Sequence, residues 1–209
     1  EFEAQVKLQD KILKRIFGIT PKVFSNTELA YRNDLAQWAE KNSYKGIIAE
    51  GWDPILGWRT SNFVYEPVGT KKIKLLLKNY RLSDDIAFRF SNQAWSEWPL
   101  TADKFASWVN AVNGNGETVN LFMDYETFGE HQWEHTGIFE FLRHMPKEIL
   151  RNKDNGFKTL TETCKAYEAK DVVDMPHIVT WADTERDLTA WTGNSMQQSS
   201  LSELYRIEG

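Results

Sequence analysis

The sequence predicts an α/β fold in which helices alternate with strands that run parallel. Short apolar runs that end in polar or acidic residues recur along the chain, and segments with helical periodicity lie between them. This alternation is typical of parallel β/α units. Because parallel strands bring their C-terminal ends to one rim, we expect carboxylates that are distant in sequence to meet in one cleft.

Four runs are predicted as strands, and each leads into an acidic residue. The runs lie in residues 21–28, 45–51, 119–123 and 177–183, and they lead into Glu28, Glu50, Asp124 and Asp183. The run before Asp124 is mostly apolar, so a buried strand is expected there.

Two segments are predicted as amphipathic helices. Residues 34–41 place Leu35, Trp38 and Ala39 on one face, with Asn33 as the N-cap. Residues 102–112 place an apolar face of Phe105, Trp108, Val109 and Val112 between the cap Thr101 and Gly114. These patterns combine a 3.6-residue period with start and stop residues.

Composition predicts one soluble domain over residues 1–209. The chain has 209 residues, 41% apolar and 26% charged, with a net charge of −5. The acidic balance argues against a nucleic-acid partner, and no apolar run is long enough for a membrane span. The lone Cys164 excludes an internal disulfide and fits a reducing, cytoplasmic location. The oligomeric state stays open.

Nine tryptophans are unusually many for this length. Several fall in expected loops, including Trp52 in the long segment 52–70, which we expect to be a functional loop. A large aromatic side chain in a loop must pack on something. The partner is either the loop itself or the flat face of a sugar.

Residues 124–131 concentrate three acidic groups and a histidine after an expected strand. A carboxylate here either serves chemistry or caps the next turn. The following His131-Gln132-Trp133-Glu134-His135 matches a zinc peptidase pattern, but the segment lacks a convincing helix, so we predict no metal. No Walker loop, dinucleotide fingerprint or CxxC pair is present, so no cofactor is predicted. Glycoside cleavage by two carboxylates fits the remaining chemistry.

Four segments of the chain resemble glycoside hydrolase family 57, and within it the α-amylase-like group. They are residues 24–31, 82–90, 123–129 and 181–194. The resemblance implies an incomplete seven-stranded parallel β/α barrel. It also implies a retaining hydrolase whose substrate is an α-1,4-glucan or a maltooligosaccharide.

The resemblance implies Glu28 as the catalytic nucleophile and Asp124 as the general acid/base. Asp124 would have to keep its proton near neutral pH, helped by apolar neighbours and by the like charge of Glu28 or Glu126. Glu50 would hold a sugar hydroxyl, with a structural pair to Lys45 or Arg59 as the alternative. The predicted substrate-binding residues are Glu50, Trp52, Asp85, Glu126, Phe128, His131, Trp181, Asp183, Asp187 and Trp191.

Two sequence blocks of the family are missing before Glu1. We therefore expect the chain to be the central part of a longer catalytic domain, truncated at both ends, and to have little activity alone. Two other functions remain open. One is a 4-α-glucanotransferase, in which a sugar hydroxyl replaces water at the same site. The other is a non-catalytic glucan-binding homologue.

Overall fold

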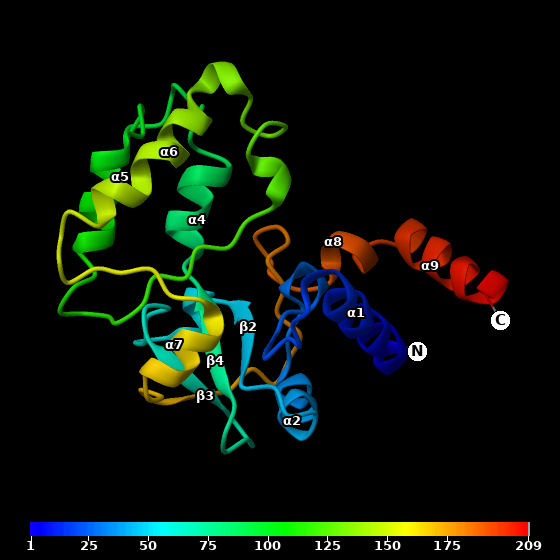
Figure 1. The fold of residues 1–209 in the computed structure, drawn as a ribbon. Helices are drawn as coiled ribbons and strands as arrows, with labels where there is room; N and C mark the ends of the chain where they lie inside the picture. Colours follow the sequence, from blue (N-terminus) through cyan, green and yellow to red (C-terminus); the bar gives the residue numbers. More distant parts are fainter. Residues whose placement is uncertain (209) are drawn as a thin grey trace.

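The structure, a computed structural model, describes residues 1–208. These residues form a five-stranded sheet with helices on both faces and a layer of helices beyond one of its ends (Figure 1). The predicted α/β class with a mostly parallel sheet is confirmed.

The sheet has the strand order β1-β2-β4-β3-β5. Strands β1, β2 and β4 run parallel, β3 is antiparallel to β4, and β5 is parallel to β3. The strands are β1 (Val23–Phe24), β2 (Gly46–Glu50), β3 (Val64–Pro67), β4 (Lys74–Lys78) and β5 (Val172–Val173). Strands β3 and β5 therefore run opposite to β1, β2 and β4, and neither lies in a segment predicted as a strand.

Both faces of the central strands are buried, as is usual for parallel strands that helices cover on either side. Ile47 and Leu75 point into the main core, which they share with Ala39 of α2 (Asn33–Lys41). On the other face, Leu76 packs with Cys164 of α7 (Leu160–Ala166). The continuous apolar runs of β2 and β4 follow from this burial on both sides.

Helix α7 approaches the sheet closely at Gly46. A Cβ atom placed on Gly46 would lie 2.5 Å from Cys164 Sγ. Glycine is needed at this position because a larger side chain would push α7 away from β2. Burial also raises the pKa of the Cys164 thiol to about 11, consistent with a structural cysteine.

Residues 80–150 form what we call the helical lobe, which extends beyond the C-terminal end of β4 (Figure 1). Its helices are α4 (Tyr80–Ala87), α5 (Ala102–Asn110) and α6 (Ile138–Ile149). Phe105 and Phe141 stack edge to face at 5.7 Å in its core. The predicted helix after Thr101 is confirmed, although it ends at Asn110, before Val112.

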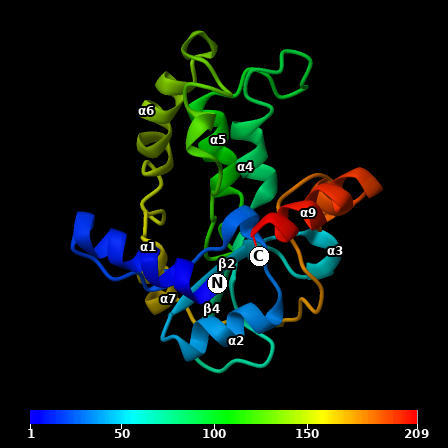
Figure 2. The ribbon, with the colours of Figure 1, turned by 90° about the vertical axis from the view of Figure 1, so that its right-hand side faces the viewer.

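Two long helices near the chain ends lie on the same side of the sheet (Figures 1 and 2). They are α1 (Phe2–Phe17) and α9 (Ser195–Glu208), and neither contains a buried residue. Phe2 of α1 stacks on Phe24 and Trp38, with ring centroids 6.1 and 4.9 Å apart. The remaining helical elements are α3 (Asp53–Leu56), α8 (Thr189–Thr192), η1 (Thr27–Leu29), η2 (Tyr125–Thr127) and η3 (Glu134–Thr136).

Two predicted strands are not strands. Residues 119–123 are half-buried, but two of their backbone groups bond outside the sheet: Asn120 O accepts from Asn79 N, and Phe122 N donates to Ser83 Oγ. In residues 177–183, only Val179 pairs, through an isolated antiparallel bridge to Tyr31. Neither segment is a strand of the five-stranded sheet.

Two smaller predictions are also corrected. Residues 52–70 contain α3 and β3 and are not one long loop. The N-cap of α2 is Arg32, because the Asn33 side chain is used elsewhere, accepting from Met175 N at 2.9 Å.

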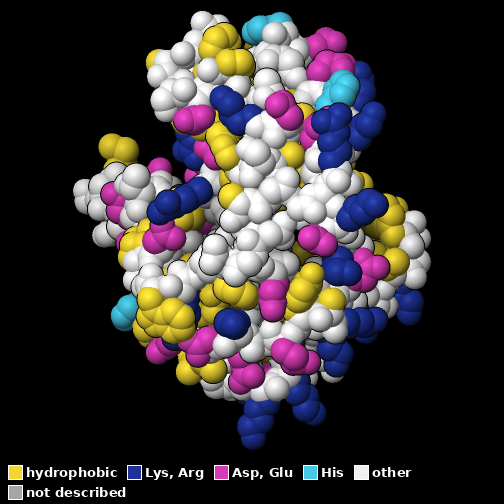
Figure 3. Space-filling view, turned by 90° about the vertical axis from the view of Figure 1, so that its left-hand side faces the viewer, with side chains coloured by type: hydrophobic (Ala, Val, Ile, Leu, Met, Phe, Trp, Pro, Cys, Tyr) yellow, Lys and Arg dark blue, Asp and Glu magenta, His cyan; other side chains and the backbone are white. Residues whose placement is uncertain are grey.

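Within residues 1–208, no helix has the length and apolar character needed to cross a membrane. The face shown in Figure 3 carries acidic and basic side chains interspersed, without a broad patch of either sign.

Candidate active site

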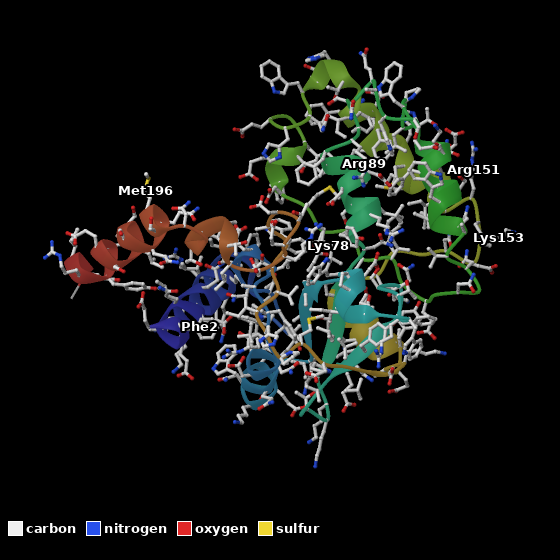
Figure 4. All side chains as sticks on the ribbon, turned by 180° about the vertical axis from the view of Figure 1, so that it is seen from behind. Phe2, Lys78, Arg89, Arg151, Lys153 and Met196 are labelled. Atoms are coloured by element: carbon white, nitrogen blue, oxygen red, sulfur yellow. The ribbon has the colours of Figure 1, made fainter. Side chains whose placement is uncertain are left out.

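The C-terminal ends of three parallel strands meet at one rim of the sheet. β1 leads into Glu28, β2 ends at Glu50 and β4 ends at Lys78. The register pairs Phe24 with Ile47, and Glu50 with Lys78. Figure 4 shows Lys78 between the sheet and the helical lobe. The expected meeting of strand ends is therefore found at this rim.

A cavity of about 240 Å³ opens between the rim and the helical lobe. Glu28 lines it from the sheet side and Asp124 from the lobe side. The lining residues are Glu28, Lys78, Asp84, Ala87, Phe88, Met123, Asp124, Thr127, His131, Trp181, Ala182 and Asp183. The two candidate catalytic carboxylates thus share one cavity.

The Glu28 side chain is anchored. Its Oε2 accepts a hydrogen bond of 2.8 Å from Trp181 Nε1, and its carbonyl accepts one of 3.2 Å from Trp181 N. Glu28 and Leu29 have positive φ angles of 58° and 51°, a conformation that disfavours residues with a Cβ. The burial of Leu29 helps to hold this turn. The backbone therefore pays a conformational cost to direct Glu28 toward the cavity.

Asp124 is held more loosely. It is exposed and precedes η2, where its carbonyl accepts from Thr127 N at 3.2 Å, but its carboxylate makes no capping bond. The capping role considered for Asp124 is therefore not seen. The turn below it is fixed by Gln132, which is buried and donates to Ala87 O at 2.9 Å.

Four charged side chains behind Glu28 form what we call the rim charge cluster: Glu50, Lys78, Asp84 and Arg186. Lys78 Nζ lies 3.7 Å from Glu50 Oε2 and 3.4 Å from Asp84 Oδ1. Arg186 Nη1 lies 3.2 Å from Glu50 Oε2, and its Nη2 lies 3.8 Å from Asp84 Oδ2. Two cations offset two anions, which is what makes their burial tolerable.

Glu50 is the most deeply buried member of the rim charge cluster, with none of its surface exposed. Burial raises the pKa of its carboxyl group, while Lys78 and Arg186 act in the opposite direction. The structural alternative expected for Glu50 was a pair with Lys45 or Arg59, and the partners are instead Lys78 and Arg186. Glu50 does not line the cavity, so contact with a sugar hydroxyl stays a prediction.

Trp181 connects the rim charge cluster to Glu28. Lys78 Nζ lies 4.9 Å from the centre of its ring, within cation–π range. Phe122 stacks on the ring edge to face at 5.4 Å. Arg186 Nη1 donates to the Trp181 carbonyl at 2.5 Å. These contacts hold the Trp181 indole in place, so that its N–H group points at the Glu28 carboxylate.

The zinc peptidase pattern does not have the geometry that it requires. His131 lies in a turn, Gln132 forms an isolated bridge with Phe128, and only Glu134–Thr136 are helical, as the short η3. His131 lines the cavity, whereas the ring of His135 lies beside that of Trp133. Across residues 1–208, no group of three or more His, Cys, Asp or Glu side chains could hold a metal ion.

The arrangement can be compared with known proteins. The family profile described as "Glycosyl hydrolase family 57" matches residues 1–176. This chain belongs to glycosyl hydrolase family 57. A relative from Methanocaldococcus jannaschii, named "Putative alpha-amylase", is 47% identical over 210 residues, covering 99% of this chain and 44% of the relative. The chain thus spans less than half of that relative's length.

Two solved structures share the fold. A family 57 branching enzyme from Thermococcus kodakaraensis, solved with glucose, aligns with a TM-score of 0.72 at 14% identity, over 98% of this chain and 50% of that one. The 4-alpha-glucanotransferase of Thermococcus litoralis aligns with a TM-score of 0.65 at 15% identity, over 83% of this chain and 27% of that one.

Three of the substrate-binding residues predicted from the family 57 resemblance lie at the cavity. They are His131, Trp181 and Asp183. Asp183 is exposed and has a positive φ of 49°, which places it on a tight turn. These three come from two segments, 124–131 and 181–194, that the sequence patterns singled out.

The other predicted contacts of this family 57 chain do not line the cavity. Trp52 packs against the main core, and Phe128 against the core of the helical lobe. Glu126 is exposed on η2, and Trp191 is 41% exposed on α8. Contact of these four with a longer substrate stays a prediction.

Two predicted aspartates have structural partners. Asp85 accepts from Arg89 Nε at 2.6 Å, and burial raises the pKa of its carboxyl group. Asp187 accepts from both the hydroxyl and the backbone N–H of Thr189, and the hydroxyl bond is the main cause of its lowered pKa. Asp187 thus stabilises the turn that leads into α8.

Sequence reasoning missed three functional candidates: Lys78, Asp84 and Arg186. Lys78 did carry a signal, because a lysine that directly follows the apolar Leu75-Leu76-Leu77 at a strand end is unusual unless it has partners. Asp84 and Arg186 lie in the segments 82–90 and 181–194 that resemble the family, but no sequence pattern indicates that Arg186 pairs with Glu50 and Asp84 at the rim.

Proposed function

We propose that this protein is a retaining glycoside hydrolase of α-1,4-glucans, with Glu28 as the nucleophile and Asp124 as the general acid/base. One observation carries the proposal: both side chains line the same cavity at the C-terminal rim of the parallel strands. Open α/β folds place their reactive groups at this rim. The retaining mechanism requires the two carboxyl groups to stand about 5–5.5 Å apart around the bound sugar.

The reaction would proceed in two displacements. Glu28 attacks the anomeric carbon and forms a glycosyl ester, while Asp124 donates its proton to the glycosidic oxygen of the departing chain. Asp124 then removes a proton from water, whose oxygen attacks the same carbon and releases Glu28. Two inversions leave the configuration of the product unchanged.

The substrate class is supported from two directions. The M. jannaschii relative is named as an α-amylase, and its 47% identity extends across nearly all of this chain. The cavity also presents the aromatic ring of Trp181 beside polar groups from His131 and Asp183. Aromatic faces and polar side chains are suited to the apolar and hydroxyl surfaces of a glucan or maltooligosaccharide.

The test is azide rescue of a Glu28→Ala variant in the full chain, with a maltooligosaccharide carrying an activated aryl leaving group. The expected product is a β-glycosyl azide, because a small anion can occupy the vacated nucleophile site. Asp124→Ala is the matched variant, and it is expected to give an α-glycosyl azide, since Glu28 still forms the intermediate. An exchange of these two outcomes would reverse the roles.

Incubation of the unsubstituted protein with maltotriose distinguishes hydrolysis from glucan transfer. New reducing ends without longer products support the hydrolase, whereas longer oligosaccharides at constant reducing value identify a 4-α-glucanotransferase. Binding of maltotriose without either product would mean a non-catalytic glucan-binding homologue. We place the activity in the cytoplasm, because the single cysteine is a buried free thiol.

A further inference from the structure

The contact between Trp181 and Glu28 is part of a longer chain of contacts. Trp181 Nε1 donates to Glu28 Oε2 at 2.8 Å, and the Trp181 carbonyl accepts from Arg186 Nη1 at 2.5 Å. The same Nη1 lies 3.2 Å from Glu50 Oε2. A continuous path of polar contacts therefore runs from the buried end of β2 to the candidate nucleophile.

Arg186 is itself tightly held. Its side chain is 13% exposed and lies between the carboxylates of Glu50 and Asp84, which are 0% and 13% exposed. Its guanidinium carbon stands 5.2 Å from the centre of the Tyr80 ring. Its carbonyl accepts from Thr180 N at 2.8 Å, and its φ of 54° marks a strained turn. Few alternative positions remain for this guanidinium group.

The contact with Trp181 suits an ionised nucleophile. An N–H donor favours the charged form of a carboxylate. It also occupies one carboxylate oxygen and leaves the other for attack on the sugar. The left-handed turn places Glu28 at the cavity, and the carboxylate of this exposed side chain takes its hydrogen bond from Trp181 and not from its own segment.

We propose that Arg186 is a positioning residue, which fixes Trp181 so that the indole N–H holds the Glu28 carboxylate in its attacking orientation. The inference rests on the proposed function, since it assumes that Glu28 is the nucleophile. A displacement of about 1 Å at a reacting group can cost about 100-fold in rate. Arg186 acts on the reaction through Trp181.

Two substitutions test this path in the full chain. Arg186→Lys keeps the positive charge beside Glu50 and Asp84. The single ammonium group of lysine lacks the planar set of donors that lets arginine also bond the Trp181 carbonyl. Replacement of Trp181 by benzothienylalanine keeps the shape of the ring and removes only its N–H donor. Trp181→Phe is a second, encoded variant with the same missing donor, in case the unnatural residue is poorly incorporated.

Each variant is expected to lower kcat about 100-fold and to change KM less than about threefold, because orientation of the nucleophile matters in the transition state. A loss confined to KM would mean that Trp181 only binds sugar and would overturn the proposal.

The chain offers matched controls among residues that do not line the cavity. Trp38 Nε1 donates to Glu3 Oε1 at 3.1 Å, so Trp38→Phe also removes an indole–glutamate bond. Arg59 bonds Asp171 Oδ2 at 2.7 Å and also contacts the Leu56 carbonyl, so Arg59→Lys disturbs a comparable arginine. Both controls should retain kcat. Equal kcat losses in the controls and the test variants would contradict the proposed path.

The decisive comparison repeats Trp181→Phe in the Glu28→Ala background with azide as the nucleophile. Here no carboxylate remains to be oriented, so the substitution should cost less than about threefold. A loss as large as in the wild-type background would refute positioning, while azide rescue would still support the proposed function. If Glu28→Ala gives no azide product at all, the nucleophile assignment fails, and both proposals fail with it.

Discussion

The two walls of the cavity hold their carboxylates in different ways. On the sheet wall, Glu28 receives two hydrogen bonds from Trp181, which the rim charge cluster holds in turn. On the lobe wall, Asp124 lies on a short turn, exposed and without a capping bond from its side chain. One group is fixed before substrate arrives, and the other still has freedom to move.

This difference matches the tasks proposed for the two residues. A nucleophile must meet one carbon atom along one line, so its orientation determines the rate. A general acid that later acts as a base must reach a leaving oxygen and then a water molecule. Catalytic hydrogen bonds of such groups often tighten only when substrate is bound. The comparison therefore predicts that substitutions on the sheet wall and on the lobe wall have different signatures.

The largest effect is expected from Glu28→Gln. The amide oxygen of the new side chain can still accept the Trp181 hydrogen bond, so the wall should keep its geometry while it loses the nucleophile. The value of kcat on maltooligosaccharides should fall by more than about 10⁴-fold, with the unfolding midpoint unchanged. Steady-state kinetics and thermal unfolding measure the two quantities. Substantial remaining activity would remove Glu28 from the chemistry.

Asp124→Asn is expected to cost less and to depend on the substrate. The value of kcat should fall about 10²- to 10⁴-fold on maltooligosaccharides, because the leaving oxygen is no longer protonated. The rate of the first step on an activated aryl maltoside, whose leaving group needs no proton, should stay close to wild type. Burst kinetics with both substrates decide this, and equal losses on the two would contradict the role of acid.

The third prediction compares two lysines at opposite ends of β4. Lys78 is 4% exposed between two carboxylates, whereas Lys74 pairs with Glu168, which is 98% exposed. Lys78→Met leaves the two buried carboxylates of Glu50 and Asp84 with a single cation, Arg186, so one negative charge is uncompensated. The free energy of unfolding should fall by about 3–5 kcal/mol. Lys74→Met should cost less than about 1 kcal/mol. Urea unfolding measures both free energies, and similar values would show that Lys78 in the rim charge cluster stabilises the fold no more than a surface pair does.

The smallest effect is expected at the edge of the cavity. Asp183 lines it, whereas Asp187 bonds Thr189 and does not. Asp183→Asn should raise KM about two- to tenfold with kcat retained, the loss of about one hydrogen bond to substrate. Asp187→Asn should affect KM less. Equal increases would mean that the whole segment 181–194 contacts sugar, as the sequence resemblance implies.

Local patterns predicted the sheet wall better than the lobe wall. Residues 21–28 and 45–51 are short apolar-leaning runs with terminal carboxylates, and they form β1 with its turn and β2. Residues 119–123 have the same pattern but form no strand, because their backbone partners are Asn79 and the Ser83 hydroxyl. The apolar pattern of a segment predicts that the segment is buried. It does not predict which groups form hydrogen bonds with its backbone N–H and C=O groups.

Neither the antiparallel strand β3 nor the rim charge cluster could be predicted from local sequence patterns. The prolines and glycines around β3 indicate a loop, and only its pairing with β4 makes it a strand. The rim charge cluster joins residues from four separate segments. Its ion pairs depend on tertiary geometry, which no local spacing encodes.

The left-handed turn at Glu28 has a consequence for how this position can change over generations. A glycine there would adopt the φ of 58° without steric cost, and it would also remove the only side chain that the proposed chemistry attacks with. Glu28→Gly is therefore expected to fold at least as well as the parent while losing all turnover. The residue that suits the backbone at position 28 is glycine, whereas the proposed chemistry requires glutamate. A duplicated gene that is no longer selected for activity can therefore acquire Glu28→Gly and still encode a well-folded, inactive protein.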